Sequence, residues 1–133
     1  MRLTSSAAVL VLLAVAGCGG SDDSFTDRYN DAVRPISRLE AGMGTQPREF
    51  DRLARSTEAA RRKLDKLDPP DDAQDEFAAF LAQLDKVTAD LKAVATAARS
   101  HDVAAQRKAA GQLVTSSTRI QRAETALKQA VED

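Results

Sequence analysis

Apolar residues recur every three or four positions from residue 25 to the end of the chain, with polar residues between them. This spacing places the apolar side chains on one face of an α-helix. No stretch alternates apolar and polar residues for long enough to predict a strand. Four helical stretches follow one another: Phe25 to Met43, Phe50 to Leu67, Ala73 to Ala98, and Val103 to Ala130.

Short breaks separate these stretches, at Gly42 to Pro47, at Pro69-Pro70, and at Ser100 to Asp102. Short connections between amphipathic helices favour antiparallel neighbours. The sequence therefore predicts an all-α fold, an antiparallel up-down-up-down four-helix bundle. The first two helices are expected to run about 18 to 20 residues and the last two about 30, so the second pair would project by about three turns. Residues 93–111 would then form a hairpin with no other helix beside it.

The ends of the predicted helices carry residues that stabilise helix termini. Ser24, Asp71 and Asp102 are expected to cap the first, third and fourth helices, and Pro47 to occupy the first turn of the second. Pro35 is expected to kink the first helix or to split it near Val33. Charged pairs four residues apart are expected on solvent-facing sides: Asp51 with Arg55, Glu58 with Arg62, and Glu124 with Lys128.

Gly111 lies inside the fourth predicted helix, where glycine is about 1 kcal/mol less favourable than alanine. The sequence offers no reason for it beyond local packing.

The beginning of the chain has a different pattern. Arg2 precedes an unbroken apolar run from Ala7 to Ala16, and the only cysteine, Cys18, follows two residues later. Crossing a bilayer takes about 20 apolar residues, so this run is too short for a membrane span and is typical of a secretory signal.

Val15-Ala16-Gly17-Cys18 resembles the lipobox of bacterial lipoproteins. The resemblance implies cleavage between Gly17 and Cys18, a diacylglyceryl group on the cysteine sulfur with acyl chains such as palmitate, and anchoring at the extracytoplasmic face of the cell membrane. Residues 1–17 would be the signal peptide, 18–23 the lipidated cysteine and a flexible tether, and 24–133 the bundle. The alternative is an ordinary signal peptide in which Cys18 has no role.

The segment from Leu64 to Pro70, LDKLDPP, resembles a turn found in small helical-bundle lipoproteins of high-GC Gram-positive bacteria. No activity is assigned to that group, so the resemblance implies a location and a fold but no reaction.

Composition narrows the classes of function. The formal net charge of −1, from 19 Lys and Arg against 20 Asp and Glu, gives no basic surface of the kind that binds nucleic acid. One cysteine and one histidine exclude a multi-thiolate zinc site and a histidine cluster. No Glu-x-x-His motif is present, which excludes ferritin-like di-iron chemistry.

The remaining candidates for chemistry each have a simpler explanation. His101 lies in a turn without a triad partner, and Met43 with His101 lacks the facing positions of a haem axial pair. The acidic residues around the Pro69-Pro70 turn lack calcium-loop spacing, and helix capping explains most of them. These are Asp68, Asp71, Asp72, Asp75 and Glu76. We therefore expect no metal, no cofactor and no catalytic residue.

Two surfaces remain as candidates for contact with partners. A basic run near the end of the second helix would lie close to the membrane, although cations also favour any helix C-terminus. It comprises Arg55, Arg61, Arg62, Lys63 and Lys66. The small side chains of the 93–111 hairpin would let a partner helix approach, with Val94, His101, Val103 and Arg107 as contacts.

The sequence thus favours a membrane-anchored, non-enzymatic lipoprotein whose helical bundle binds an envelope protein or polymer. The alternative is a carrier of a small apolar ligand or lipid between the helices, which needs a gap in the core. The sequence does not set the oligomeric state.

Overall fold

The computed structural model describes residues 23–133. Cys18, Gly17 and the proposed signal and tether positions up to residue 22 lie outside the described residues. The described chain contains helices α1 (Asp23–Ala41), α2 (Pro47–Leu64), α3 (Gln74–Ser100) and α4 (Val103–Glu132), with a short 3₁₀ helix, η1 (Asp71–Ala73), before α3. No strand occurs in residues 23–133. The predicted all-α four-helix bundle is therefore confirmed.

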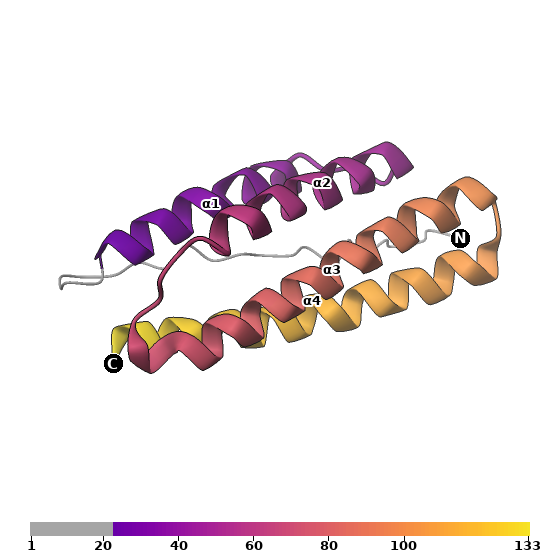
Figure 1. The fold of residues 1–133 in the computed structure, drawn as a ribbon. Helices are drawn as coiled ribbons and strands as arrows, with labels where there is room; N and C mark the ends of the chain where they lie inside the picture. Colours follow the sequence, from indigo (N-terminus) through magenta and orange to yellow (C-terminus); the bar gives the residue numbers. More distant parts are fainter. Residues whose placement is uncertain (1–22) are drawn as a thin grey trace.

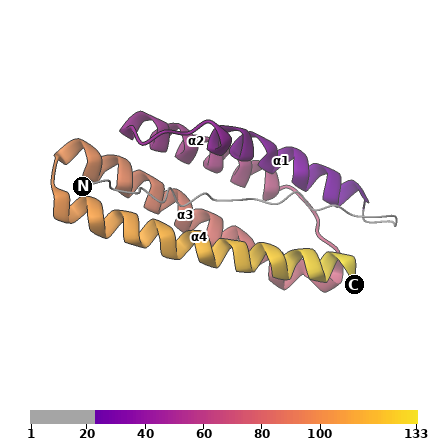
Figure 2. The same cartoon turned by 180° about the vertical axis from the view of Figure 1, so that it is seen from behind.

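The helices form two stacked hairpins (Figures 1 and 2). The α1–α2 pair lies on the α3–α4 pair, and successive helices run in opposite directions, as the short breaks predict. Direct backbone packing joins α1 to α2, α2 to α3, and α3 to α4. The helix lengths of 19, 18, 27 and 30 residues agree with the predicted lengths.

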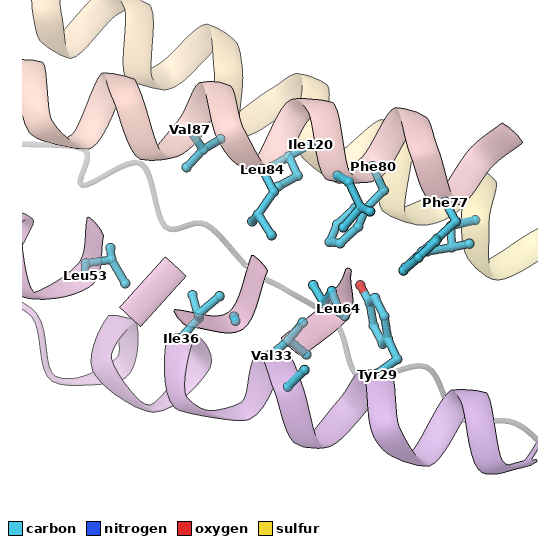
Figure 3. Packing of buried hydrophobic residues seen from close by; sticks show 14 of the residues in the cluster. Tyr29, Val33, Ile36, Leu53, Leu64, Phe77, Phe80, Leu84, Val87 and Ile120 are labelled. Carbon is cyan, nitrogen blue, oxygen red and sulfur yellow. The ribbon is translucent and has the colours of Figure 1, made fainter. Parts of the chain in front are cut away.

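The core lies between the two hairpins, where large apolar side chains from all four helices meet (Figure 3). Aromatic rings connect α1 to α3: Phe25 packs edge-on against Phe77 at a centroid distance of 5.3 Å, and Tyr29 lies 5.6 Å from Phe80. The fully buried members include Tyr29, Ile36, Leu64, Phe80, Leu84, Val87, Leu91, Ile120 and Leu127.

Two of the predicted helix starts are confirmed. α2 begins at Pro47, and the Asp102 side chain accepts a hydrogen bond from the Ala105 N–H at 3.1 Å at the start of α4. At the turn before α2, the Glu49 carboxylate accepts the backbone N–H groups of Gly44 and Gln46 at 3.1 and 3.0 Å. These bonds lower the pKa of Glu49 and close the turn onto the helix.

Three local predictions are wrong. α1 already includes Asp23, so Ser24 lies inside the helix and does not cap it. The predicted split of α1 near Val33 does not occur, since α1 continues through Pro35 as one helix. Asp71 begins η1 and accepts a hydrogen bond from the Gln74 side chain, while α3 starts at Gln74 without a side-chain cap.

Two of the three predicted pairs within single helices are replaced by pairs between helices. Asp51 pairs with Arg99 and Glu58 with Lys92, which joins α2 to α3, and Arg61 bridges Asp65 and Asp85. The hydrogen bond from Arg99 lowers the pKa of Asp51. These partners are partly exposed, so solvent screens the pairs and each contributes little to stability.

The α3–α4 hairpin reaches beyond the turn between α1 and α2, as the difference in helix length predicts (Figures 1 and 2). The expectation that residues 93–111 have no other helix beside them is wrong for the α3 half. The ion pair of Arg99 with Asp51 places α2 beside α3 almost to its last turn. Ala95, Ala97 and Ala109 within this segment are buried.

Candidate functional site

The residues predicted as a partner surface do not form one continuous exposed face. Val103 is 65% exposed, and His101 and Arg107 are also exposed, all near the tip of the α3–α4 hairpin. Val94 is half-buried and packs against the core. The tip therefore offers one exposed apolar side chain beside polar ones, and Val94 contributes mainly to packing.

His101 ends α3 in the left-handed conformation, with φ of 56°. A residue in this conformation commonly terminates a helix, and glycine is usual there because a Cβ is strained at positive φ. The left-handed conformation at the end of α3 shows that His101 acts as the residue that terminates this helix. Met43 is half-buried against the core and does not form a facing pair with the exposed His101.

No group of three or more His, Cys, Asp or Glu side chains within residues 24–133 is arranged to hold a metal ion. Of the acidic residues near the Pro69-Pro70 turn, Asp71 is engaged by Gln74 at 3.3 Å. In the basic run of α2, Arg61 is paired with Asp65 and Asp85, whereas Arg55, Arg62, Lys63 and Lys66 are exposed.

A buried polar pair links α1 to α4. The Tyr29 hydroxyl donates to the Glu124 carboxylate at 3.0 Å, and the two residues are 0% and 4% exposed. Figure 3 shows the Tyr29 hydroxyl pointing from α1 toward the α3–α4 layer. Burial and the neighbouring Glu124 charge raise the pKa of Tyr29 above its ordinary value, so the phenol stays protonated and remains a donor.

Glu124 was expected on the solvent face beside Lys128, and this expectation is wrong. A burial signal was present in the sequence, because Glu124 lies four residues after Ile120 and three before Leu127. That spacing continues the apolar stripe. The negative charge of Glu124 argued against a buried position, since carboxylates are rarely buried unless they are paired.

A second carboxyl group, Glu40, lies partly inside the bundle near the end of α1. Its Oε1 atom is buried and has no hydrogen-bond partner. Burial, followed by the Glu124 charge, raises the pKa of Glu40 to about 8. Most of the Glu40 population is therefore neutral at physiological pH, which lowers the electrostatic cost of burial.

The described residues also form a groove along the middle of the second hairpin, with a volume of about 390 Å³. We call it the α3–α4 groove. No residue of α1 or α2 lines it. Its lining residues are Lys86 and Asp90 from α3, and Lys108, Gly111, Gln112, Thr115, Ser116 and Arg119 from α4.

This groove was not predicted from the sequence. Positions 108, 112, 115 and 119 recur at helical spacing, so one face of the fourth helix was recognisable as polar. The contribution of Lys86 and Asp90 depends on the alignment of α3 with α4, which no local pattern encodes. Asp90 is 9% exposed, and its Oδ2 atom is buried without a hydrogen-bond partner.

Comparison of the chain with protein-family models, curated protein sequences and solved structures finds no significant match. None of the helices within residues 23–133 combines the length and the apolar character needed to cross a membrane.

Proposed function

We propose that this chain is an extracytoplasmic lipoprotein, anchored in the cell membrane through Cys18, whose helical bundle binds an envelope partner without catalysing a reaction. The observation that carries the proposal is Val15-Ala16-Gly17-Cys18 at the end of the apolar run from Ala7 to Ala16. Acyl chains contribute about 0.8 kcal/mol per buried methylene, so two or more chains give a durable anchor.

The fold is compatible with this arrangement. α1 begins at Asp23, five residues after Cys18, and an extended tether of that length reaches at most about 18 Å. The start of α1 and the Pro69-Pro70 turn would then lie near the membrane. The turn between α3 and α4 would point away from it and would be available to an envelope partner.

Cys18→Ser tests the anchor. We expect this variant to appear in the soluble fraction or to accumulate as the uncleaved precursor, while the parent chain sediments with membranes. A matched control is Ser21→Ala, which changes a neighbouring hydroxyl and leaves the cysteine in place. A Cys18→Ser chain that stays in the membrane and is still cleaved after Gly17 would refute the proposal.

Partner binding is tested separately by crosslinking in intact cells. We expect an envelope component to be captured by the intact chain, and to be lost when the α3–α4 hairpin is altered at its exposed Val103 and Arg107. Recovery of the same component from cells with and without these substitutions would exclude the hairpin tip as the contact.

The alternative, a carrier of an apolar ligand, has less support. Aromatic and aliphatic side chains fill the space between the two hairpins (Figure 3). Charged or polar side chains contribute to both the α3–α4 groove and a smaller pocket near Arg38, Glu49 and Arg52. Lipid extraction followed by mass spectrometry tests the carrier directly.

A further inference from the structure

Three cationic side chains, of Lys86, Lys108 and Arg119, line the α3–α4 groove. Within residues 24–133 none of the three takes part in an ion pair, whereas Arg61, Lys92 and Arg99 on the α2–α3 side are all paired. Together with Asp90 they leave the groove with a formal charge of +2. A groove with this charge favours an anionic ligand.

Asp90 indicates a second requirement of the ligand. This carboxylate is nine-tenths buried beside the groove, and its Oδ2 atom has no hydrogen-bond donor. A buried acceptor without a donor is unfavourable, and native proteins usually supply one from protein, water or ligand. Asp90 is one of the residues that line the groove, so a hydrogen-bond donor on a ligand bound there would lie next to this carboxylate. The ligand is therefore expected to carry a hydrogen-bond donor as well as a negative charge.

The hydroxyl groups that line the groove also bear on whether it favours a ligand with hydrogen-bond donors. Thr115 donates its hydroxyl hydrogen to the Gly111 carbonyl at 3.1 Å, and Ser116 donates to the Leu113 carbonyl at 3.1 Å. With its hydrogen engaged, the exposed Thr115 oxygen can still accept a hydrogen bond from a ligand, whereas Ser116 is fully buried. The groove thus combines three cations for an anion with two acceptor side chains, Asp90 and Thr115, for hydroxyl groups.

Gly111 is an exposed residue that lines the groove. It lies inside α4, where glycine is about 1 kcal/mol less favourable than alanine. No atom within 4 Å of a Cβ built at Gly111 explains its absence. The packing of the protein therefore does not require glycine here. A glycine at this position leaves room for a ligand to approach the helix backbone closely.

We propose that the α3–α4 groove binds a phosphorylated polyol, with the phosphate held by Lys86, Lys108 and Arg119 and a ligand hydroxyl donating to Asp90. A phosphate monoester carries about −1.5 to −2 charges at neutral pH, which matches the formal charge of the groove. The volume of about 390 Å³ lies within the range of small-ligand sites. This goes beyond the proposed anchoring and does not depend on Cys18.

Two sources supply this chemistry, a lipid headgroup and a soluble or polymer-bound sugar phosphate. Lys86 and Asp90 lie 12 and 16 residues after the start of α3, which is about 18 to 24 Å along the helix. An upright, anchored bundle would hold the groove above the headgroups of its own membrane. A bundle that lies with its α3–α4 face on the membrane would bring the groove to the headgroups.

Calorimetric titration of the full chain in a non-ionic detergent tests the proposal. The probes are myo-inositol 1-phosphate, inorganic phosphate, myo-inositol, and the short-chain lipid dihexanoyl-phosphatidylinositol. We expect myo-inositol 1-phosphate to bind at least about tenfold more tightly than inorganic phosphate, because only the former offers hydroxyl donors, and uncharged myo-inositol not to bind. Affinity should fall as salt is added.

The lipid arm separates the two sources. Binding of the lipid as tight as that of the monoester supports a headgroup, and preference for the monoester supports a soluble or polymer-bound ligand. Either result is consistent with a polyol phosphate as the ligand of the groove. Inorganic phosphate binding as tightly as myo-inositol 1-phosphate, or no binding of any phosphate, would overturn the proposal.

Matched variants locate the site. Arg119→Gln should weaken myo-inositol 1-phosphate about tenfold or more, whereas Arg122→Gln, one turn further along α4 and outside the groove, should not. Gly111→Leu should abolish binding by filling the groove, yet it should leave the helix at least as stable, since leucine is a better helix former than glycine. Ala110→Leu, at the neighbouring exposed position outside the groove, is the control.

These variants keep the test independent of folding. Far-ultraviolet circular dichroism and melting temperatures report whether each chain is folded. A folded Gly111→Leu chain that binds myo-inositol 1-phosphate as tightly as the parent would place the ligand elsewhere and refute the assignment of the groove.

Discussion

The buried hydrogen bond between Tyr29 and Glu124 permits a quantitative test of the core. Tyr29→Phe removes one hydroxyl group and keeps the ring that packs against Phe25 and Phe80. Both partners are at most 4% exposed, so water cannot replace the lost donor without rearrangement. A hydrogen bond to a charged group contributes about 1.5 to 3 kcal/mol.

Glu124 has further interactions besides the one with Tyr29, so we expect a loss near the lower end, about 1.5 to 2 kcal/mol. For a folded unit of this size that corresponds to a decrease in melting temperature of roughly 5 to 10 °C. The assay is urea and thermal unfolding followed by circular dichroism, at constant pH and salt.

Glu124→Gln supplies the comparison. This variant keeps the shape and an oxygen acceptor but removes the buried charge, so it should destabilise less than Tyr29→Phe and can stabilise. In the double variant, the effect of Tyr29→Phe should shrink by about 1 kcal/mol, because the neutral amide needs the donor less. An unchanged or increased stability of Tyr29→Phe would show that the hydroxyl does not stabilise the buried carboxylate, and the reasoning would fail.

Three further predictions follow from single positions. Leu84→Ala at the fully buried centre of α3 should destabilise by about 2 to 5 kcal/mol in the same unfolding assay. Glu40→Gln should stabilise by about 1 to 2 kcal/mol near pH 9, a figure reduced from the full pKa shift because solvent screens this partly exposed group, and should have little effect near pH 4. The reason is that the folded pKa of Glu40, about 8, lies above the unfolded value of 4.5, so the parent chain loses stability as pH rises through that window. His101→Gly should stabilise by about 0.5 to 1 kcal/mol by relieving the left-handed backbone, and an unchanged melting temperature would contradict the strain.

Local patterns in the sequence were sufficient for the secondary structure and the antiparallel order. The four helices, their lengths, Pro47 at the start of α2 and the Asp102 cap all depend on residues within a few positions of one another. Helix periodicity and capping are short-range effects, so they can be recognised from one sequence. The lipobox is likewise a contiguous motif, and its prediction rests on the sequence alone.

The side of each helix that is buried depended on its neighbours. Ala123 and Glu124 both continue the stripe of α4, and apolar character favoured Ala123. The structure buries Glu124, because the Tyr29 hydroxyl of α1 lies opposite it and supplies a donor. A buried carboxylate is favourable only with such a partner, and that partner lies 95 residues away in the chain.

The α3–α4 groove depended entirely on tertiary structure. Lys86 and Asp90 precede the turn between the helices, and Lys108 to Arg119 follow it. Each half alone resembles an ordinary solvent-exposed helix face, and Gly111 alone resembles an unfavourable residue. The register of the antiparallel pair places three cations, a buried carboxylate and a glycine around one space. That register is set by side-chain packing between the helices, which involves contacts distant in sequence and therefore leaves no local signal.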